Sequence, residues 1–554
     1  MSVRYTEEQL KKLDPQMLIS IIQNQQEQLD SVNQKLDWLM EQIRVANNKL
    51  YGHHSEKMPQ NDVNQLSLFD MYPALNEAEA TADSSVKEPD VEVVVASYRR
   101  KKKPGKRQED LKDLPEEFIN HPVSKEELDQ FFGPGNYRRF QDEHYDRLRY
   151  QPARWIVERH SVEVYVGTDG LHQDEFLRGD HEPGLFRGSI ATPSLVAAII
   201  NGKYTNALPL YRIEQEFKRN DINISRQTMA NWMIGIAEHY LPPLYDALKE
   251  RLLRYHVNQA DETPVQVLHL SDEKGNSKPE VNTSTCYMWV HRSGEFYKEE
   301  PVVLYEFVHG RGHEYPLAFY KDFNGVLVTD SLEQYHTIEK KLKGVTSANC
   351  WDHLRRPFTD AISAMSKDDP GLRESVAWKA LAKIAAIYHV EASLKDMTPE
   401  VRLKHRQEAV KPLVDAFFAW VKQILADGAV MPKSKTGNGL NFAVNQEQYL
   451  RVFLTDGEVP ISDAASERAI RPFTVGRKNW ILINTEKGAR ASALLYSITE
   501  TAKLNNLKPY YYFEYILEKL PGIVSKDGGA DPEEIKKLLP WAVELPEECR
   551  IKRR

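Results

Sequence analysis

The sequence ISDAASERAIRPFTVGRKNW, residues 461–480, contains the acid around which the rest of the chain can be interpreted. This acid is Glu467, which lies in a predicted Ala-rich helix. Ser462 or Asp463 can cap the helix, and Pro472 bounds its regular part. Asp463, Glu467 and Arg471 share one helix face. The basic residues near Glu467 are Arg468, Arg471, Arg477 and Lys478. A solvated, salt-bridged surface helix would also show this pattern, so its meaning depends on acids elsewhere in the chain.

Two further acids stand in apolar, strand-like stretches upstream. Asp261 lies within HVNQADETPVQVLHL, residues 256–270, and Asp330 follows the buried-strand pattern of GVLVTDS, residues 325–331. The predicted order is three strands, a helix, a strand, a helix and a strand, with the Glu467 helix much later. The other strands are predicted over residues 285–291, 301–309 and 345–351, and the first helix over 315–320. This order can bring the three acids to one edge of a mixed sheet.

Three carboxylates at one sheet edge suit a particular kind of chemistry. Two-metal phosphoryl transfer needs oxygen ligands that hold two Mg²⁺ ions roughly 3.5–4 Å apart. One ion activates the attacking oxygen and the other stabilises the leaving oxygen. The sequence therefore predicts a site for two Mg²⁺ ions, for which Mn²⁺ could substitute.

Longer motifs resemble those of the insertion-sequence 66 family of transposases. They are LYGHHSEK (50–57), KYTNALPLYR (203–212), NQADETP (258–264), VTDS (328–331), CWDHLRRPF (350–358), SERAIRPFTVGRKNW (466–480) and ALLYSITETAKLNNLKP (493–509). The resemblance implies a catalytic core with an RNase H-like fold. It places an Asp, Asp, Glu triad on Asp261, Asp330 and Glu467, which would be both the catalytic residues and the metal ligands. It also implies that small accessory proteins of the same element assist.

The expected fold class is multidomain α+β. We predict a coiled coil (1–58), an acidic linker (59–97), a basic tract with a degenerate zinc-ribbon-like small β unit (98–190) and a helix-turn-helix-like DNA-binding region (191–250). The RNase H-like core follows in two parts (251–358 and 459–505), separated by a helical insertion (359–458), and the C-terminal segment (506–554) is helical. Helices in the insertion are predicted over residues 376–394 and 399–426.

Composition restricts the cellular setting. The formal net charge of −8 does not exclude DNA binding, because the charge is unevenly distributed along the 554 residues. There is no apolar run long enough to span a membrane and no hydrophobic signal core. The three cysteines are far apart and odd in number, which favours free thiols in a reducing compartment. We therefore expect a cytoplasmic bacterial protein, associated with the nucleoid when bound to DNA.

The N-terminal region has features of assembly and of phosphate binding. Apolar residues at alternating spacings of four and three between Leu18 and Leu50 predict a coiled coil, and hence a homodimer or a larger oligomer. A helix docked on its own domain is the alternative. Seven bases from Arg99 to Arg107 could neutralise DNA phosphates, or could belong to a disordered solubilising tract.

The zinc-binding segment that the family usually carries has lost its cysteine pairs here. No cysteine precedes Cys286, and the histidines between residues 114 and 187 lack the paired spacing of a tetrahedral site. No zinc is therefore predicted. The alternating sequence of residues 154–166 favours a small β unit that is stable without metal.

Two further segments are candidates for DNA contact. In the helix capped by Ser225, Arg226, Gln227 and Asn231, with Trp232, occupy the early turns where a helix-turn-helix contacts base edges. A plain three-helix packing unit is the alternative. After Asp330, the CWDHLRRPF motif supplies a ring that could stack on an unpaired base and cations that could hold phosphates. These residues are Trp351, His353, Arg355 and Arg356, and a buried Trp with surface arginines is the alternative.

The predicted function is that of a DNA transposase. It would bind the terminal inverted repeats of its element and target DNA, hydrolyse phosphodiester bonds and transfer the exposed 3′ hydroxyls. The bases around Glu467 would bind the DNA backbone, and the loop KSKTGNG (433–439) could follow the strand. Two alternatives stay open. One is a nuclease of the same fold that does not join strands, and the other is an inactive coiled-coil DNA-binding protein.

Overall fold

A computed structural model describes residues 14–20, 22–26, 126, 130, 134, 155–166, 176–178, 184–186, 188–271, 282, 284–363, 365, 371–525 and 527–552. The chain divides into two compact units, residues 1–60 with 181–554 and residues 61–180. The coiled coil predicted between Leu18 and Leu50 lies mostly outside the described residues, although residues 15–20 and 22–26 are helical. The acidic linker and the basic tract lie entirely outside them.

A mixed five-stranded sheet forms the centre of the larger unit. Its strands are β3 (Val257–Val265), β5 (Cys286–Ser293), β6 (Val303–Val308), β7 (Gly325–Thr329) and β8 (Val345–Asn349), arranged in the order β6-β5-β3-β7-β8. β5 pairs antiparallel with β3 and β6, whereas β7 pairs parallel with β3 and β8. The connecting helices are α9 (Glu314–Phe319) and α10 (Glu333–Lys341). The predicted order of strands and helices is therefore confirmed.

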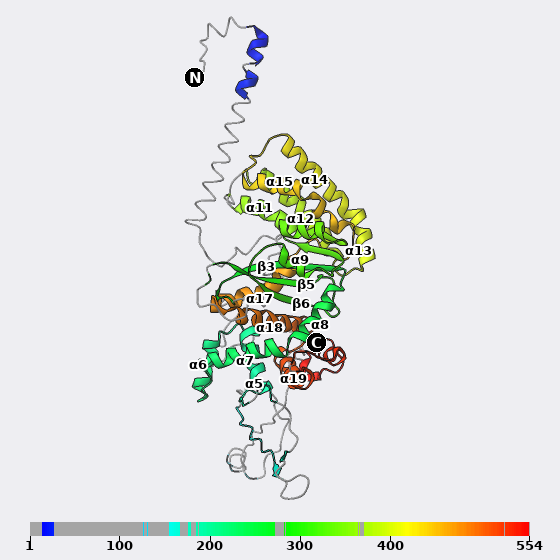
Figure 1. The fold of residues 1–554 in the computed structure, drawn as a ribbon. Helices are drawn as coiled ribbons and strands as arrows, with labels where there is room; N and C mark the ends of the chain where they lie inside the picture. The colour runs from blue at the N-terminus through cyan, green and yellow to red at the C-terminus, as the bar shows by residue number, and fades with distance from the viewer. Residues whose placement is uncertain are drawn as a thin grey trace. The chain divides into compact units, whose positions relative to one another are not determined.

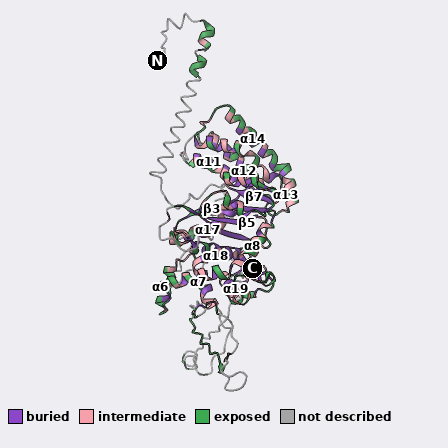
Figure 2. Ribbon diagram, in the orientation of Figure 1, coloured by how far each residue is buried: buried purple, intermediate pink, exposed green. Residues whose placement is uncertain are grey.

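The parallel half of the sheet is buried on both faces. Every residue of β7 is buried, as expected for a parallel strand covered by helices (Figure 2). Its first residue must be glycine, because a Cβ at Gly325 would lie 2.1 Å from the carbonyl oxygen of His256. Val326 and Val328 belong to one hydrophobic core and Leu327 to another, so alternate residues of β7 face different cores.

The antiparallel edge of the sheet is closed by a helix. Helix α18 (Glu486–Leu504) lies along β6, and its hydroxyl side chains bond to the strand's backbone. Ser497 Oγ accepts from Tyr305 N at 2.7 Å, and Thr501 Oγ1 accepts from Val303 N at 3.0 Å and donates to Val303 O at 2.7 Å. The outward backbone groups of Val303 and Tyr305 on this edge strand are therefore satisfied. A separate short parallel pair is formed by β4 (Val267–His269) and β9 (Ile483–Thr485), and β9 directly precedes α18 in the sequence.

Within the described residues 188–256, four α-helices precede the sheet, and the last of them was not predicted from the sequence. They are α5 (Pro193–Ile200), continued by a π-helical stretch (Asn201–Thr205), α6 (Leu210–Arg219), α7 (Arg226–His239) and α8 (Pro242–Leu253). Ser225 caps α7 as expected, because its side chain accepts from Thr228 N at 3.1 Å. Helix α5 also packs against α19 (Pro509–Ile523), which is followed by the short α20 (Pro532–Lys536).

The insertion between β8 and the Glu467 helix forms a second hydrophobic core, above the sheet in Figure 1. Its helices are α11 (Trp351–Ser363), α12 (Val376–Leu394), α13 (Pro399–His405), a π-helical turn (Arg406–Val410), α14 (Lys411–Ala426), α15 (Lys435–Asn445) and α16 (Glu447–Leu450). Both predicted insertion helices are present. The predicted KSKTGNG loop is wrong, because Ser434 caps α15 at Gly437 N and most of the motif is helical.

A buried arginine fastens this insertion to the chain that leaves it. Arg406 is completely buried and forms two hydrogen bonds to Glu391, of 2.9 and 2.8 Å. Its Nη1 also donates to the carbonyl oxygens of Phe453, Asp456 and Val459. These carbonyls lie just before the helix that carries Glu467. The insertion therefore fixes the start of that helix.

In the smaller unit, the described strands are β1 (Val164–Val166) and β2 (Phe176–Arg178), which pair antiparallel. Only the last three residues of the predicted strand over residues 154–166 enter this pair. Val164 and Tyr165 are exposed, so packing of these two side chains does not explain the pair's stability. Across all the described residues, no helix has both the length and the apolar character needed to cross a membrane.

Candidate active site

The register of the central strands places two of the predicted acids side by side. β3 and β7 pair in parallel through Asn258 with Leu327 and Gln259 with Val328. Extending this register by two residues brings Asp261 level with Asp330, which directly follows the end of β7. Paired residues of neighbouring strands point to the same face. Both aspartates therefore project on the face that also carries Gln259 and Val328.

Local backbone bonds hold both aspartates. Asp261 Oδ1 accepts from Glu262 N at 2.8 Å, and Asp330 Oδ1 accepts from Leu332 N at 3.2 Å. The residue after Asp330, Ser331, has φ of +77°. Left-handed backbone at a non-glycine residue is uncommon and is concentrated at functional sites. The sharp turn after β7 thus orients Asp330 at some conformational cost.

The third acid, Glu467, is on α17 (Ala464–Trp480). Ser462 Oγ accepts from Ala464 N at 3.0 Å at the start of the helix. Asp463 occupies the N-cap position, but its side chain makes no capping bond. The prediction that Pro472 bounds the helix is wrong, because the helix continues through it. Proline removes one hydrogen bond, and tertiary packing of the surrounding residues maintains the helix on both sides.

Glu467 faces α11. Its Oε1 lies 3.4 Å from Arg356 Nη2 and 3.7 Å from His353 Nε2. Burial, followed by the neighbouring Arg356, lowers the pKa of His353 to about 4. His353 is therefore neutral near pH 7 and forms no ion pair with Glu467. Within the described residues, its buried Nδ1 has no hydrogen-bond partner.

Burial and neighbouring acids raise the pKa of both aspartates. Burial raises the pKa of Asp261 to about 8, with further contributions from Glu262, Asp330 and Glu467. Burial and Glu262 raise the pKa of Asp330 to about 6, although Arg311 and Arg356 oppose this change. Carboxyl groups at such positions resist simultaneous ionisation. The site is short of positive charge at its centre.

Asp463 is a fourth acid in this cluster. It is completely buried, and burial raises its pKa well above the ordinary range, with Asp261 as the next cause. Gln259 Nε2 donates to Asp463 Oδ1 at 3.2 Å and to Ser462 O at the same distance. Asp463 Oδ2 is buried and makes no hydrogen bond to any described residue. Asp463 thus links α17 to β3.

Glu262 points away from this cluster, as alternation along a strand predicts. On the opposite face its Oε1 accepts from Arg311, at 2.6 Å from Nη2 and 2.7 Å from Nε. Its Oε2 accepts from Tyr335 at 2.7 Å. These bonds hold β3 in place at the residue next to Asp261. Glu262 therefore has a positioning role in this geometry.

The CWDHLRRPF motif divides between the core and the site. Trp351 is completely buried and packs against Phe417, Phe418 and Phe453, with Nε1 donating to Leu450 O at 2.8 Å. The prediction that it stacks on an unpaired base is therefore wrong, because its ring is inside the insertion core. Arg355 lies 3.4 Å from Asp352 and over the ring of Tyr388. His353 and Arg356 reach Glu467.

The bases on α17 have different surroundings. Arg468 is mostly buried and pairs with Glu295 at 3.1 Å. Arg477 donates to Thr263 Oγ1 at 3.1 Å and to Pro264 O, at the end of β3. Arg471 is half-buried and Lys478 is exposed. Arg468 and Arg477 therefore hold α17 on the sheet, and Arg471 and Lys478 are the more accessible cations.

The predicted DNA-contacting residues of α7 share its exposed side. Arg226, Gln227 and Asn231 are exposed, and Arg226 lies over the ring of Tyr211. The suggestion that Trp232 joins them is wrong, because its side chain is buried in the helical core. Helix α7 packs against α18, α5 and α6. The structure thus places these three residues on an element separate from α17 and α11.

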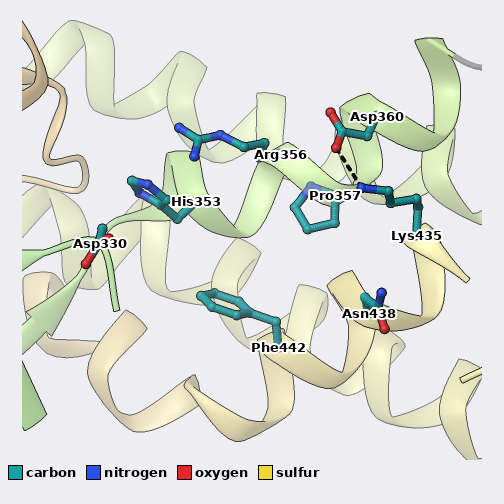
Figure 3. A pocket seen from close by; sticks show the side chains of 8 residues that line it. All are labelled: Asp330, His353, Arg356, Pro357, Asp360, Lys435, Asn438 and Phe442. Atoms are coloured by element: carbon teal, nitrogen blue, oxygen red, sulfur yellow. Dashed lines mark hydrogen bonds and ion pairs between the residues drawn. The ribbon is translucent and has the colours of Figure 1, made fainter. Parts of the chain in front are cut away.

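A cavity of about 320 Å³ opens beside Asp330, between α11 and α15 (Figure 3). It is lined by Asp330, His353, Arg356, Pro357, Asp360, Lys435, Asn438 and Phe442. The helices approach closely at Gly439, where a Cβ would lie 2.7 Å from the ring of Phe358. Phe442, Pro357 and Asp360 were not predicted from the sequence. The glycines of KSKTGNG are compatible with close packing, but they do not indicate which helix packs against them.

Comparisons with known proteins identify the family of this chain. The family model described as "Transposase IS66 family" matches residues 188–491, which include the whole sheet and all three acids. The chain belongs to the IS66 family of transposases. The model described as "IS66 C-terminal element" matches residues 497–541 of the transposase. The model described as "Transposase C of IS166 homeodomain" matches residues 38–119, outside the described residues.

Three proteins of Sinorhizobium fredii are similar to this transposase, and each is described only as an uncharacterised protein. The protein y4qI is 30% identical over 409 residues, which are 72% of the transposase and 70% of y4qI. The protein y4hP is 24% identical over 64% of the transposase and 62% of its own length. The protein y4jD is 27% identical over 64% of the transposase and 66% of its own length. The resemblance drawn from the sequence motifs is therefore confirmed at the level of the family.

Proposed function

We propose that this transposase hydrolyses phosphodiester bonds at the ends of its element and joins the exposed 3′ hydroxyls to target DNA. The strongest support is that Asp261 lies on β3 and Asp330 directly follows the parallel neighbour β7, while the Glu467 helix is attached to β3 through Gln259. The strand order β6-β5-β3-β7-β8 supports an RNase H-like core. Such sites catalyse by position and charge neutralisation.

The proposed cofactor is a pair of Mg²⁺ ions, replaceable by Mn²⁺, held by Asp261, Asp330 and Glu467. These residues offer the carboxylate oxygens that hard cations prefer. The raised pKa values of both aspartates fit such a site, because a cation would relieve their repulsion. As placed, no three His, Cys, Asp or Glu side chains of the described residues are close enough to hold an ion together. The carboxylates would therefore turn toward a shared ion on binding.

When bound, the ions would activate the attacking oxygen and stabilise the leaving oxygen of the phosphodiester. The chain's own residues would position the strand. Arg356 contacts Glu467 and is 59% exposed at its side chain, so it can reach a phosphate beside the acids. Arg471 and Lys478 would bind the flanking backbone. Arg468 and Arg477 would act indirectly, by holding α17 on the sheet.

Recognition of the element ends is assigned, within the same proposal, to α7. Arg226 suits guanine, and Gln227 and Asn231 suit adenine, through paired hydrogen bonds in the major groove. Their common exposure on one capped helix supports this assignment. Removal of base-reading side chains should lower discrimination between element ends and unrelated DNA. Competition binding of Gln227→Ala and Asn231→Ala, against the exposed-surface control Gln423→Ala, measures this change.

Two further parts of the proposal concern assembly. The predicted coiled coil between Leu18 and Leu50 would join two copies, because two element ends must be brought together. Small accessory proteins of the same element would assist. Light scattering of the full chain and of a variant with charged residues at Leu29 and Leu36 tests the first part.

The central experiment is Mg²⁺-dependent cleavage and strand transfer on labelled DNA from the element ends. Wild type is compared with Asp261→Asn, Asp330→Asn and Glu467→Gln, which preserve side-chain shape. Asp322→Asn is the matched control, because Asp322 is 72% exposed at its side chain. We expect each triad variant to bind DNA while losing at least about 100-fold in cleavage and joining. The control should retain both.

Other outcomes separate the alternatives. Cleavage without joined product would favour a nuclease of the same fold. If wild type binds element ends but is as inert as the triad variants, even with accessory proteins supplied, the catalytic proposal fails. The inactive DNA-binding alternative would then replace it.

A further inference from the structure

The cavity between α11 and α15 combines three kinds of chemistry. Phe442 of α15 and Pro357 of α11 supply apolar rings, and Asn438 supplies a carboxamide (Figure 3). Arg356 and Lys435 supply positive charge along its rim. Asp330 closes the end nearest the acids. This combination of ring, amide and cations is what recognition of a nucleotide requires.

The cations can exchange their present partners for phosphate. Lys435 Nζ lies 3.2 Å from Asp360, and both side chains are substantially exposed, at 40% and 46%. Arg356 lies 3.4 Å from Glu467 and is more exposed still. Ion pairs between exposed groups are weak. A DNA backbone passing the acids could therefore engage both cations at little cost.

The size of the cavity restricts its occupant. Pockets for small ligands range from roughly 300 to 1,000 Å³, so a cavity of about 320 Å³ is at the lower limit. A space of this size suits one small planar group such as a single nucleobase. Phe442 is half-buried, since part of its ring contacts the insertion core and part lines the cavity. A ring held in this way is a fixed stacking surface.

We propose that this cavity binds one unpaired nucleotide of the DNA strand, next to the phosphodiester at the acids. The base stacks on Phe442 and bonds to Asn438, and Arg356 and Lys435 hold the adjoining phosphates. The inference rests on the proposed function for the path of the strand. Stacking on an aromatic side chain repays part of the cost of taking a base out of the duplex.

A strand of DNA is favoured over a free nucleotide because of what adjoins the cavity. Asp330 lines the cavity, and Arg356, which also lines it, contacts Glu467. A continuous strand contacts both places at once, whereas a mononucleotide contacts one. Free nucleotide is therefore the competing occupant, and the test includes it.

The test uses the full chain and element-end duplex in which one base beside the cleavage position faces an abasic site. That base is 5-iododeoxyuridine, which forms photo-crosslinks to aromatic side chains in contact. Binding is measured in EDTA, so that no cutting occurs, against the fully paired duplex. The variants are Phe442→Leu and Asn438→Ala. The matched control is Tyr511→Leu, because Tyr511 is an exposed aromatic residue on α19.

We expect wild type to bind the unpaired duplex about 5- to 150-fold more tightly than the paired duplex. The crosslink should map to Phe442. Phe442→Leu should lose the crosslink and most of the preference while its affinity for paired DNA is unchanged. Asn438→Ala should lose part of the preference, and Tyr511→Leu should behave as wild type.

Three results would overturn the proposal. They are equal binding of the two duplexes by wild type, a crosslink at another residue, and a preference that survives in Phe442→Leu. Displacement of the unpaired duplex by dAMP or ATP as effectively as by the same duplex unlabelled would assign the cavity to free nucleotide instead. Because this assay measures binding without metal, its failure is distinct from failure of Mg²⁺-dependent cleavage. A cleaving enzyme with no unpaired-base preference refutes only the cavity proposal.

Discussion

Gln259 and Asp463 are hydrogen-bonded across the contact between β3 and α17, with Nε2 of the amide 3.2 Å from Oδ1 of the acid. The same Nε2 is 3.2 Å from Ser462 O. One amide group thus joins the strand of Asp261 to the helix of Glu467. The relative position of these two acids depends on this side chain.

Gln259→Leu should impair this alignment. It leaves buried acceptors at Asp463 and Ser462 without a donor, which costs about 1–3 kcal/mol of unfolding free energy. A misplacement of about 1 Å at a reacting centre can cost roughly 100-fold in rate, so cleavage should fall by about 10- to 100-fold. Cleavage rate and thermal unfolding are measured beside Gln423→Leu, whose glutamine is exposed on α14. An unchanged cleavage rate in Gln259→Leu would refute this role.

The raised pKa values of the aspartates predict how stability depends on pH. The ordinary value is 3.8, and burial raises the pKa to about 8 for Asp261 and about 6 for Asp330. The folded state therefore favours the protonated form of both side chains. The stability that this preference contributes is complete below about pH 4 and is lost as the pH rises through 6 and toward 8.

We therefore expect the melting temperature of metal-free protein to fall between pH 5 and pH 8.5. Asp261→Asn should reduce this fall, and Asp322→Asn should not, because Asp322 is exposed. Mg²⁺ should stabilise wild type more at pH 8 than at pH 5. At pH 5 the aspartates are protonated, and Mg²⁺ must displace these protons to bind. Calorimetry across this range checks both effects. A melting temperature that rises with pH equally in all three proteins would contradict the assignment.

The Arg406–Glu391 pair should be a large contributor to the stability of the insertion. Arg406→Met leaves Glu391 buried without its partner and the carbonyls of Phe453 and Val459 without their donor. Breaking a buried pair on one side costs about 3–5 kcal/mol. The double variant Arg406→Met with Glu391→Met should recover part of this loss. Urea unfolding of the two single variants and of the double variant measures the free energy of unfolding. If the loss in the double variant equals the sum of the two single losses, the pair is not coupled.

Gly439 should tolerate no larger residue. A Cβ there would lie 2.7 Å from the ring of Phe358, so Gly439→Ala should separate α11 from α15 and cost about 1–3 kcal/mol. At Gly522, also helical, a Cβ meets nothing within 4 Å among the described residues. Gly522→Ala should be neutral or slightly stabilising, since alanine is the better helix former. Thermal unfolding of the two variants distinguishes a packing effect from a general effect of glycine replacement.

The sheet and most of its helices could be predicted because they depend on local patterns. The run Val326–Leu327–Val328 before Asp330 is typical of a buried strand, and Ser225 before α7 is a local capping signal. Asp261 could be placed on a strand because it also lies in a strand-like apolar pattern. On β3, Asp261 and Glu262 project to opposite faces, and Glu262 binds Arg311.

The errors occurred where long-range packing overrides local chemistry. Trp351 follows a strand beside predicted site residues, but the aromatic residues that bury it come from α14 and from residue 453, far along the chain. Pro472 would end an isolated helix, whereas contacts of Phe473 and Ile470 with the core maintain this one. The cavity depends on α11 meeting α15, and no local pattern indicates which two helices of the insertion approach each other.

The position of the insertion has a consequence for how the protein is made. Asp261 and Asp330 both leave the ribosome before the helices of the insertion, which supply most of the second hydrophobic core, and Glu467 leaves after them. At about 5–20 residues per second, roughly seven to thirty seconds of synthesis separate Asp330 from Glu467. During that interval the nascent chain has two acids of the cluster and lacks the third. The complete cluster can form only after the insertion has been translated, so an early-terminated chain cannot assemble it.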